Sequence, residues 1–292
     1  MTAEVTLDNF PTLKLDHVYI KDKKSLLKII NTILKDGSNS LQVVTDFDLT
    51  LTKQHINGKK ILTSFGIFSR CKQLPETYKE KSNHLYKKYR PIEIDPNLSI
   101  GIKSKAMSDW ILAAEEIMKG IPFNPNEIPE VCKNYGPDLR DRTKDLLKML
   151  YLAEIPILVF SAGLGDIVQA MLKDRDVLFN NIKIISNFLK YKDEKLAGFQ
   201  NEKLIHVFNK NEHAIEQDYL RFLEGRKNIL LMGDTIGDAS MADGIENTRA
   251  VLKIGFLYEN VENSLFSYME EFDIVLVDDQ TMQVPIDILR LL

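Results

Sequence analysis

The sequence contains 292 residues, of which 44% are hydrophobic and 27% charged, and its formal net charge at pH 7 is −4. This composition excludes a disordered chain, a fibrous repeat and a disulfide-stabilised mini-protein, and the mild negative charge argues against binding to a nucleic acid polymer. The two cysteines, Cys71 and Cys132, form no CxxC motif, and no apolar run is long enough to cross a bilayer. We therefore expect a cytoplasmic protein of one large or two unequal domains, without a membrane partner.

The first part of the chain predicts one helix, one strand and then a helical segment. Residues 21–35 have apolar side chains at helical spacing and end before Gly37, whereas residues 41–45 form a short apolar run that leads into Asp46. From about residue 53 to residue 135 helical patterns dominate and no β-rich run is evident; the predicted helices are residues 75–89, 106–118 and 126–133. This segment is expected to be a helical insertion.

Beyond Gly136 short apolar strands alternate with helices, which predicts a doubly wound α/β sheet. Such sheets bind ligands at the carboxyl ends of their strands. We expect an α/β core of residues 1–52 and 136–292, interrupted by a helical cap of residues 53–135. The predicted helices of the second part are residues 138–152, 166–172 and 214–223, the strands are residues 157–160, 182–185, 228–232, 250–254 and 273–277, and a hairpin turns at residues 192–195.

Two aspartates follow the first predicted strand of the core at a spacing of two residues. Side chains two apart in extended chain lie on one face, so Asp46 and Asp48 are expected to point together into the crevice. Two close carboxylates repel each other unless a cation lies between them or one holds a proton, and both conditions suit catalysis. A simple turn or helix cap is the alternative interpretation of this pattern taken alone.

Three further segments with candidate site residues follow predicted strands or precede a helix. Asp234 and Asp238 flank Gly237 after the strand 228–232 and offer oxygen ligands to a hard cation such as Mg²⁺, although a helix cap is the alternative. Ser161 and Ala162 follow another strand and predict a phosphate nest or, alternatively, a tight turn. Lys210 could neutralise a phosphate, although a lysine at a helix start is usually solvated.

These elements occur in an order that resembles the haloacid dehalogenase (HAD) phosphohydrolase superfamily. More specifically, residues 46–52, 89–96, 159–163, 205–210, 233–244 and 252–256 are similar to the cytosolic 5′-nucleotidase III family, which acts on pyrimidine nucleotides or 7-methylguanosine monophosphate. The resemblance implies an α/β fold: a HAD-like, Rossmannoid parallel-sheet core with a helical cap domain inserted after the first motif. It also implies Mg²⁺ as cofactor and a small nucleoside monophosphate as partner.

Carried over to this sequence, the resemblance implies a role for each site residue. The implied reaction is hydrolysis of the nucleotide to nucleoside and phosphate through an aspartyl-phosphate intermediate. Asp46 is implied to be the nucleophile and a metal ligand, and Asp48 the general acid/base and a metal ligand through its backbone carbonyl. Asp234 is implied to be a further metal ligand with Asp238 behind it, and Glu93 to recognise the nucleobase. The residues implied to bind the phosphate are Ser161, Ala162 and Lys210.

The aromatic residues that stack on the base are less clearly marked. Trp110 is one candidate, although its helical spacing with Met107 and Ile111 also suits a core position, and Phe65 and Phe68 are the others. The sequence departs from the family at Gln54 and Ile111, where aromatic residues are common. The base preference therefore stays open, with a slight preference for 7-methylguanosine monophosphate and acceptance of CMP.

A second interpretation is transfer of the phosphoryl group to another acceptor, as in a nucleoside phosphotransferase, or hydrolysis of another small phosphomonoester by a HAD phosphatase. A non-catalytic nucleotide binder is disfavoured because Asp46, Asp48, Lys210 and Asp234 are all present. No coiled-coil pattern is visible, so a monomer is expected. The histidines show no metal-ligand spacing and are assigned no catalytic role: His17, His55, His84, His206 and His213.

Overall fold

The computed structural model describes residues 4–95, 97–210, 223, 225–243, 245 and 247–292. Its centre is a seven-stranded sheet with the order β1-β11-β10-β9-β2-β5-β6, in which every pair is parallel except β1 with β11. This confirms the α/β class with a mostly parallel sheet. The strands are β1 Val18–Ile20, β2 Leu41–Thr45, β5 Ile157–Leu164, β6 Ile182–Asn187, β9 Asn228–Gly233, β10 Ala250–Leu257 and β11 Ile274–Val277.

The central strands are buried on both faces, which explains their continuous apolar sequence. Neighbouring residues of β2 enter two different hydrophobic layers, because side chains alternate along a strand: Val43 contributes to one and Val44 to the other. The larger layer lies under α1 Lys23–Asp36, α6 Thr143–Leu152, α7 Gly165–Asp174 and α10 Gln283–Leu289, and the smaller lies against α9 Val261–Glu271.

Local sequence signals fix several of these elements. Asp22 caps α1 by accepting hydrogen bonds from the backbone N–H groups of Lys24 and Ser25, and Gly37 ends the helix at a φ of 74°. The predicted hairpin is confirmed as β7 Leu189–Lys192 and β8 Lys195–Phe199. Its turn residues Asp193 and Glu194 both have positive φ, as a two-residue hairpin turn requires.

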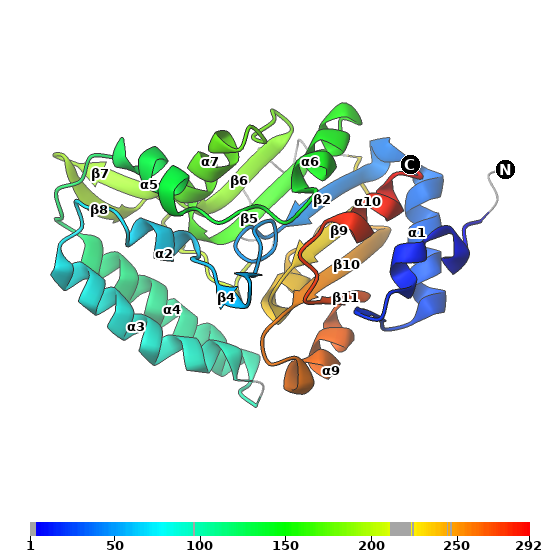
Figure 1. Ribbon diagram of the computed structural model, residues 1–292, viewed down its shortest axis with the longest axis horizontal. Helices are drawn as coiled ribbons and strands as arrows, with labels where there is room; N and C mark the ends of the chain where they lie inside the picture. The colour runs from blue at the N-terminus through cyan, green and yellow to red at the C-terminus, as the bar shows by residue number, and fades with distance from the viewer. Residues whose placement is uncertain (1–3, 96, 211–222, 224, 244, 246) are drawn as a thin grey trace.

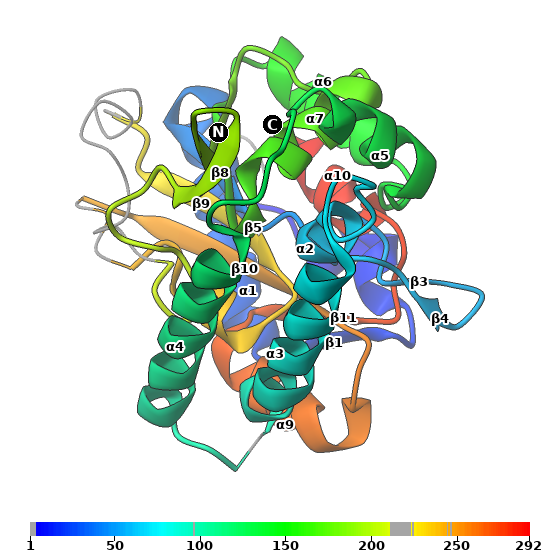
Figure 2. The same ribbon diagram turned by 90° about the vertical axis from the view of Figure 1, so that its left-hand side faces the viewer.

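The segment between β2 and β5 contains α2 Ser64–Phe68, α3 Glu76–Ile94, α4 Ile100–Met118 and α5 Glu127–Tyr135. Helices α3 and α4 pack side by side and project away from the sheet in both views (Figures 1 and 2). In contrast, α5 packs against α7 of the core. The chain after α4 also joins the core hairpin, because the backbone N–H of Gly120 donates to the carbonyl of Leu196 at 2.8 Å.

Several predicted boundaries differ from the structure. The α3 helix continues past residue 89 through Pro91 to Ile94, and α4 begins at Ile100 rather than at residue 106. A small hairpin of His55–Ile56 and Lys59–Lys60 lies in the segment expected to lack strands. The helix 138–152 begins only at Thr143, and the predicted helix 214–223 falls almost entirely outside the described residues. No helix among the described residues has both the length and the apolar character needed to cross a membrane.

Candidate active site

A cavity of about 1370 Å³ lies between the carboxyl ends of the central strands and the projecting helices. Because these strands are parallel, their carboxyl ends meet at one edge of the sheet, as expected for ligand binding in this architecture. The structure brings together at this cavity almost every residue predicted for the site: Asp46, Asp48, Phe65, Glu93, Trp110, Ser161, Ala162, Lys210, Asp234 and Asp238.

The buried ammonium group of Lys210 joins two carboxylates from different strand ends. Its Nζ donates to Oδ1 of Asp46, which follows β2, and to Oδ1 of Asp238 at 2.8 Å. Only 1% of the Lys210 side chain is exposed. Burial disfavours the charged lysine, but Asp238 and Asp46 outweigh it and keep its pKa above the ordinary value. Lys210 is therefore a positive charge held beside Asp46.

Three carboxylates meet at this end of the cavity. Asp46, Asp234 and Asp238 each offer an oxygen atom within 4.8 Å of the others. Burial, and then repulsion from Asp46 and Asp238, raises the pKa of Asp234 well above its ordinary value, and burial also raises that of Asp46. One lysine does not balance three carboxylates, and carboxylate oxygens are the ligands that Mg²⁺ prefers. The donor set therefore fits a hard divalent cation.

Asp238 differs from the other two carboxylates in its hydrogen bonds. Its Oδ2 accepts from the backbone N–H and the hydroxyl of Thr235 at 2.9 and 2.8 Å, while its Oδ1 accepts from Lys210. Asp238 lies in a short 3-10 helix, Ile236–Ser240. Gly237 allows this helix to approach the segment that contains Val207, since a Cβ at Gly237 would lie 2.1 Å from the carbonyl oxygen of Val207. Both Asp238 oxygens are thus engaged by other groups of the protein.

Asp48 is held by the segment that follows the first motif. Its Oδ1 accepts from the backbone N–H of Ser64 at 2.9 Å and its Oδ2 accepts from the Ser64 hydroxyl at 2.6 Å. The same hydroxyl accepts from the N–H of Leu164 at 3.1 Å. Burial raises the pKa of Asp48 to about 6, against the opposing effect of these Ser64 hydrogen bonds. A carboxyl group with this pKa can hold or release a proton near neutrality.

Ser161 and Ala162 lie within β5 rather than in a turn after it. The Ser161 hydroxyl accepts from the backbone N–H of Gly163 at 3.0 Å, and the Ala162 carbonyl accepts from Asn187 at 3.0 Å. A Cβ at Gly163 would lie 2.1 Å from the Ser64 hydroxyl oxygen, so glycine is required at this close approach. Ser161 therefore lines the same cavity as Asp46 and Asp48 from within a strand.

The projecting helices supply the other end of the cavity. Trp110 on α4 stacks on Tyr89 of α3 with ring centroids 5.9 Å apart, and Tyr86 meets it edge-on at 6.2 Å. Glu93 lies in the last turn of α3 and pairs with Arg90 at 2.5 Å. The helix extends through Pro91 to Ile94, so Glu93 is presented by a helix.

The assignment of Phe68 to base stacking is wrong for this structure. Phe68 is fully buried and packs on Phe123 and Tyr78, with ring centroids 5.3 and 6.1 Å apart, whereas Phe65 of the same helix lines the cavity. The side chain therefore fills the hydrophobic core under α2. Gln54 is buried and donates to the carbonyl of Phe256 at 3.1 Å.

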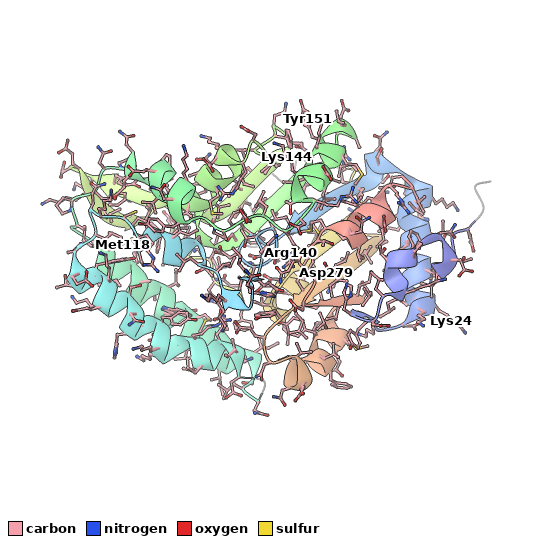
Figure 3. All side chains as sticks on the ribbon, in the orientation of Figure 1. Lys24, Met118, Arg140, Lys144, Tyr151 and Asp279 are labelled. Carbon is pink, nitrogen blue, oxygen red and sulfur yellow. The ribbon has the colours of Figure 1, made fainter. Side chains whose placement is uncertain are left out.

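Sequence reasoning missed three side chains that shape the site: Ser64, Arg90 and Arg140. Arg140 is fully buried, donates to the carbonyls of Leu49 and Thr50 at 2.6 and 2.8 Å, and also bonds the carbonyl of Asp279. Figure 3 shows Arg140 and Asp279 near each other at the centre of the molecule. The sequence marks the segment after Asp48 as part of the site. No local pattern shows that Arg140, which lies far along the chain, bonds to this segment.

Two of the described histidines, His206 and His55, line or approach the cavity and are held by hydrogen bonds. His206 accepts from the N–H of Phe208 at 3.2 Å through Nδ1, and its Nε2 lies 2.9 Å from the Ser108 hydroxyl on α4. Burial lowers the pKa of His206 to about 4, so it is neutral near pH 7. His55 bonds Asp278 and stacks on Tyr258. His213 lies outside the described residues.

Comparison with known proteins agrees with this geometry. The family model of pyrimidine 5′-nucleotidase (UMPH-1) matches residues 49–292. The chain belongs to this family of 5′-nucleotidases. A 7-methylguanosine phosphate-specific 5′-nucleotidase of Drosophila melanogaster is 44% identical over 99% of this chain and 92% of its own length. The chain is thus an enzyme of the 5′-nucleotidase class, as its sequence resemblance implied.

Solved structures place this nucleotidase among HAD-fold hydrolases. A crystal structure of cytosolic 5′-nucleotidase IIIB bound to cytidine is similar with a TM-score of 0.93 and 44% identity, over 98% of this chain and 97% of the other. A HAD family hydrolase of Salmonella enterica serovar Typhi is similar in fold alone, with a TM-score of 0.51 and 14% identity over 86% of this chain and 72% of its own. The HAD-like core is therefore confirmed.

Proposed function

We propose that this nucleotidase hydrolyses 7-methylguanosine monophosphate and CMP-type pyrimidine nucleotides, with Mg²⁺, through an aspartyl-phosphate intermediate. The observation that carries the proposal is the grouping of Asp46 and Asp234 at adjacent strand ends, with Lys210 bonded to Asp46, in one cavity with Glu93. Names of similar proteins support both substrates: one is specific for 7-methylguanosine phosphate and another was solved with cytidine.

The residues of the strand ends suit this reaction. Asp46, Asp234 and the backbone carbonyl of Asp48 would hold the metal ion, with Asp238 behind them, and a bound Mg²⁺ would supply charge stabilisation to the transferring phosphoryl group. Lys210, beside Asp46, neutralises the dianionic phosphate as the nucleophile approaches it. Ser161 and Ala162 line the same end and orient the phosphate oxygens.

The proton transfers fall to Asp48. A carboxylate oxygen of Asp46 attacks phosphorus, the bond to the 5′-oxygen breaks, and protonated Asp48 donates its proton to that oxygen as the nucleoside leaves. Ionised Asp48 then accepts a proton from the water that attacks the phosphorus of the aspartyl-phosphate. Free phosphate is released and Asp46 is restored. The raised pKa of Asp48, about 6, supports this double role.

Substrate choice is assigned to the inserted segment. Residues 53–135 serve as the cap over a core of residues 1–52 and 136–292, with α3 and α4 as its projecting part. Glu93 accepts hydrogen bonds from the base, and Trp110 or Phe65 stacks on it. We also propose a monomer that acts in the cytoplasm.

A panel of nucleoside monophosphates tests this proposal. Purified protein with Mg²⁺ is expected to release phosphate from 7-methyl-GMP and CMP faster than from AMP, and Asp46→Asn is expected to abolish release while keeping the fold. A phosphorylated wild-type enzyme, detected by intact mass after rapid quenching, would support the intermediate. Equal turnover of all bases, or full activity of Asp46→Asn, would contradict the proposal.

Adding a nucleoside acceptor distinguishes hydrolysis from phosphotransfer, because only the latter forms a new nucleotide.

A further inference from the structure

A cluster of four charged side chains surrounds the base end of the cavity. It comprises Lys60, Arg90, Glu93 and Glu259, which all line the cavity and are here called the charge cluster. Arg90 is its centre: Nη1 contacts Oε2 of Glu93 at 2.5 Å, and Nη2 contacts Oε2 of Glu259 at 3.3 Å. Lys60 contacts the other oxygen of Glu259 at 2.5 Å.

The position of Arg90 makes these contacts stronger than ordinary surface ion pairs. The side chain of Arg90 is 24% exposed and that of Glu93 is 11% exposed, so both are partly shielded from water. They are three residues apart on α3, which places them on one face of the helix. Burial disfavours the charged guanidinium, but Glu93, Glu259 and more distant Asp234 outweigh it and keep the pKa of Arg90 above its ordinary value.

Arg90 changes what a nucleobase meets at Glu93. An isolated Glu93 would present one negative charge and would favour a cationic base such as 7-methylguanine over a neutral one. With Arg90 beside it the pair has no net charge, and the full charge cluster balances two acids with two bases. Among the hydrogen bonds of the described residues, Arg90 contacts only Oε2 of Glu93, so Oε1 remains to accept a hydrogen bond from an N–H group of the base.

We infer that Arg90 is a specificity-determining residue that lowers the preference of the Glu93 site for a cationic base and so admits neutral bases to the same pocket. The inference deepens the proposed function and rests on it, because it takes Glu93 as the acceptor for the base. It assigns Glu259 the opposite effect, since Glu259 partly neutralises Arg90 from the core side.

The test compares 7-methyl-GMP with GMP, which differ at the base by one methyl group and one positive charge. The measured quantity is the ratio of their kcat/KM values, because the steric effect of the methyl group cancels when a variant is compared with the wild type. Arg90→Gln removes the charge and is expected to raise this ratio by about three- to tenfold, as expected for one elementary charge in a half-buried site. Arg90→Lys keeps the charge and is expected to leave the ratio close to that of the wild type.

A second variant and a control make the result decisive. Glu259→Gln is expected to lower the ratio, so the inference predicts opposite shifts at two partners of one ion pair. Arg249→Gln removes the same charge at an exposed pair with Asp36, outside the cavity lining, and is expected to leave the ratio unchanged. Circular dichroism and thermal melting establish whether each variant is folded. If Arg90→Gln does not fold, the shift in the ratio for Glu259→Gln still tests the inference.

Each outcome has one meaning. Opposite shifts for Arg90→Gln and Glu259→Gln support the inference. An unchanged ratio in both, or a shift as large in Arg249→Gln, overturns it while the nucleotidase activity still stands. If the wild type releases phosphate from none of 7-methyl-GMP, GMP and CMP, the proposed function is wrong and the inference is overturned with it.

Discussion

Replacing Ser64 by alanine removes a hydrogen bond that orients the carboxyl group of Asp48. The substitution changes no side chain that is proposed to bind the metal. The Ser64 hydroxyl donates to Asp48 Oδ2 at 2.6 Å and is fully buried. A hydrogen bond to a charged group contributes about 1.5–3 kcal/mol, which corresponds to about a 10- to 100-fold change in an equilibrium or rate constant. The backbone N–H of Ser64 still holds Oδ1, so Asp48 is loosened rather than released.

The expected result is a fall in kcat/KM for CMP by about 10- to 100-fold, carried mainly by kcat, because an orienting contact to the general acid acts on the reaction barrier. The N–H of Leu164 also loses its acceptor, which lowers the free energy of unfolding by about 1–3 kcal/mol. Thermal melting therefore accompanies steady-state kinetics, both at a temperature well below the transition.

Thr248→Val is the matched control. It removes a partly buried hydroxyl that donates to the carbonyl of Ile245 at 2.7 Å, away from the cavity lining. It is expected to lower the melting temperature without changing kcat. If Ser64→Ala remains folded and its kcat equals that of the wild type, the positioning argument for Ser64 is refuted.

Three further predictions concern the core, pH and the metal. Phe68→Ala is expected to lower the free energy of unfolding by about 3–5 kcal/mol, seen in urea unfolding, without changing the ratio of kcat/KM values between bases, whereas Phe65→Ala is expected to change KM. His206 has a folded pKa near 4 and an unfolded pKa of about 6.5, so the unfolded chain binds the extra proton and stability falls as pH drops through this window. The difference in melting temperature between the wild type and His206→Gln is therefore expected to be smaller at pH 5 than at pH 7.5. Removal of divalent ions with EDTA is expected to abolish phosphate release, and added Mg²⁺ should restore it; activity that persists after exhaustive chelation would contradict the metal assignment.

The catalytic end of the cavity was predictable from sequence because topology does most of the placement. Asp46, Ser161 and Asp234 follow or end apolar runs that could be recognised as strands, and parallel strands bring their carboxyl ends to one edge. The position of Lys210 beside these residues could be predicted only from the order of motifs in the family. Distances along the chain are irrelevant here, since the sheet order and not the sequence separation fixes the neighbours.

The cap end was less predictable because helix orientation depends on contacts between distant segments. Phe65 and Phe68 are three residues apart on α2, yet one lines the cavity and the other fills the core beside Phe123. Similarly, the pairing of Arg90 with Glu259 joins α3 to the chain after β10, and no local pattern records that contact. Helical periodicity identifies a buried face but does not say whether a cavity or a core covers it.

The two ends of the cavity handle buried charge differently, and this difference predicts where a metal belongs. At the catalytic end the cluster of Asp46, Asp234 and Asp238 together with the ammonium of Lys210 carries a net charge of −2 when all are ionised, and the carboxyl group of Asp48 lies in the same cavity. A divalent cation would offset that negative charge and weaken the repulsion that, after burial, raises the pKa of Asp234. At the base end the charge cluster already sums to zero and offers no such vacancy for a cation. In the proposed function, the metal ion and Lys210 offset the carboxylates where the dianionic phosphate binds, whereas the fixed charges of the charge cluster act on the base.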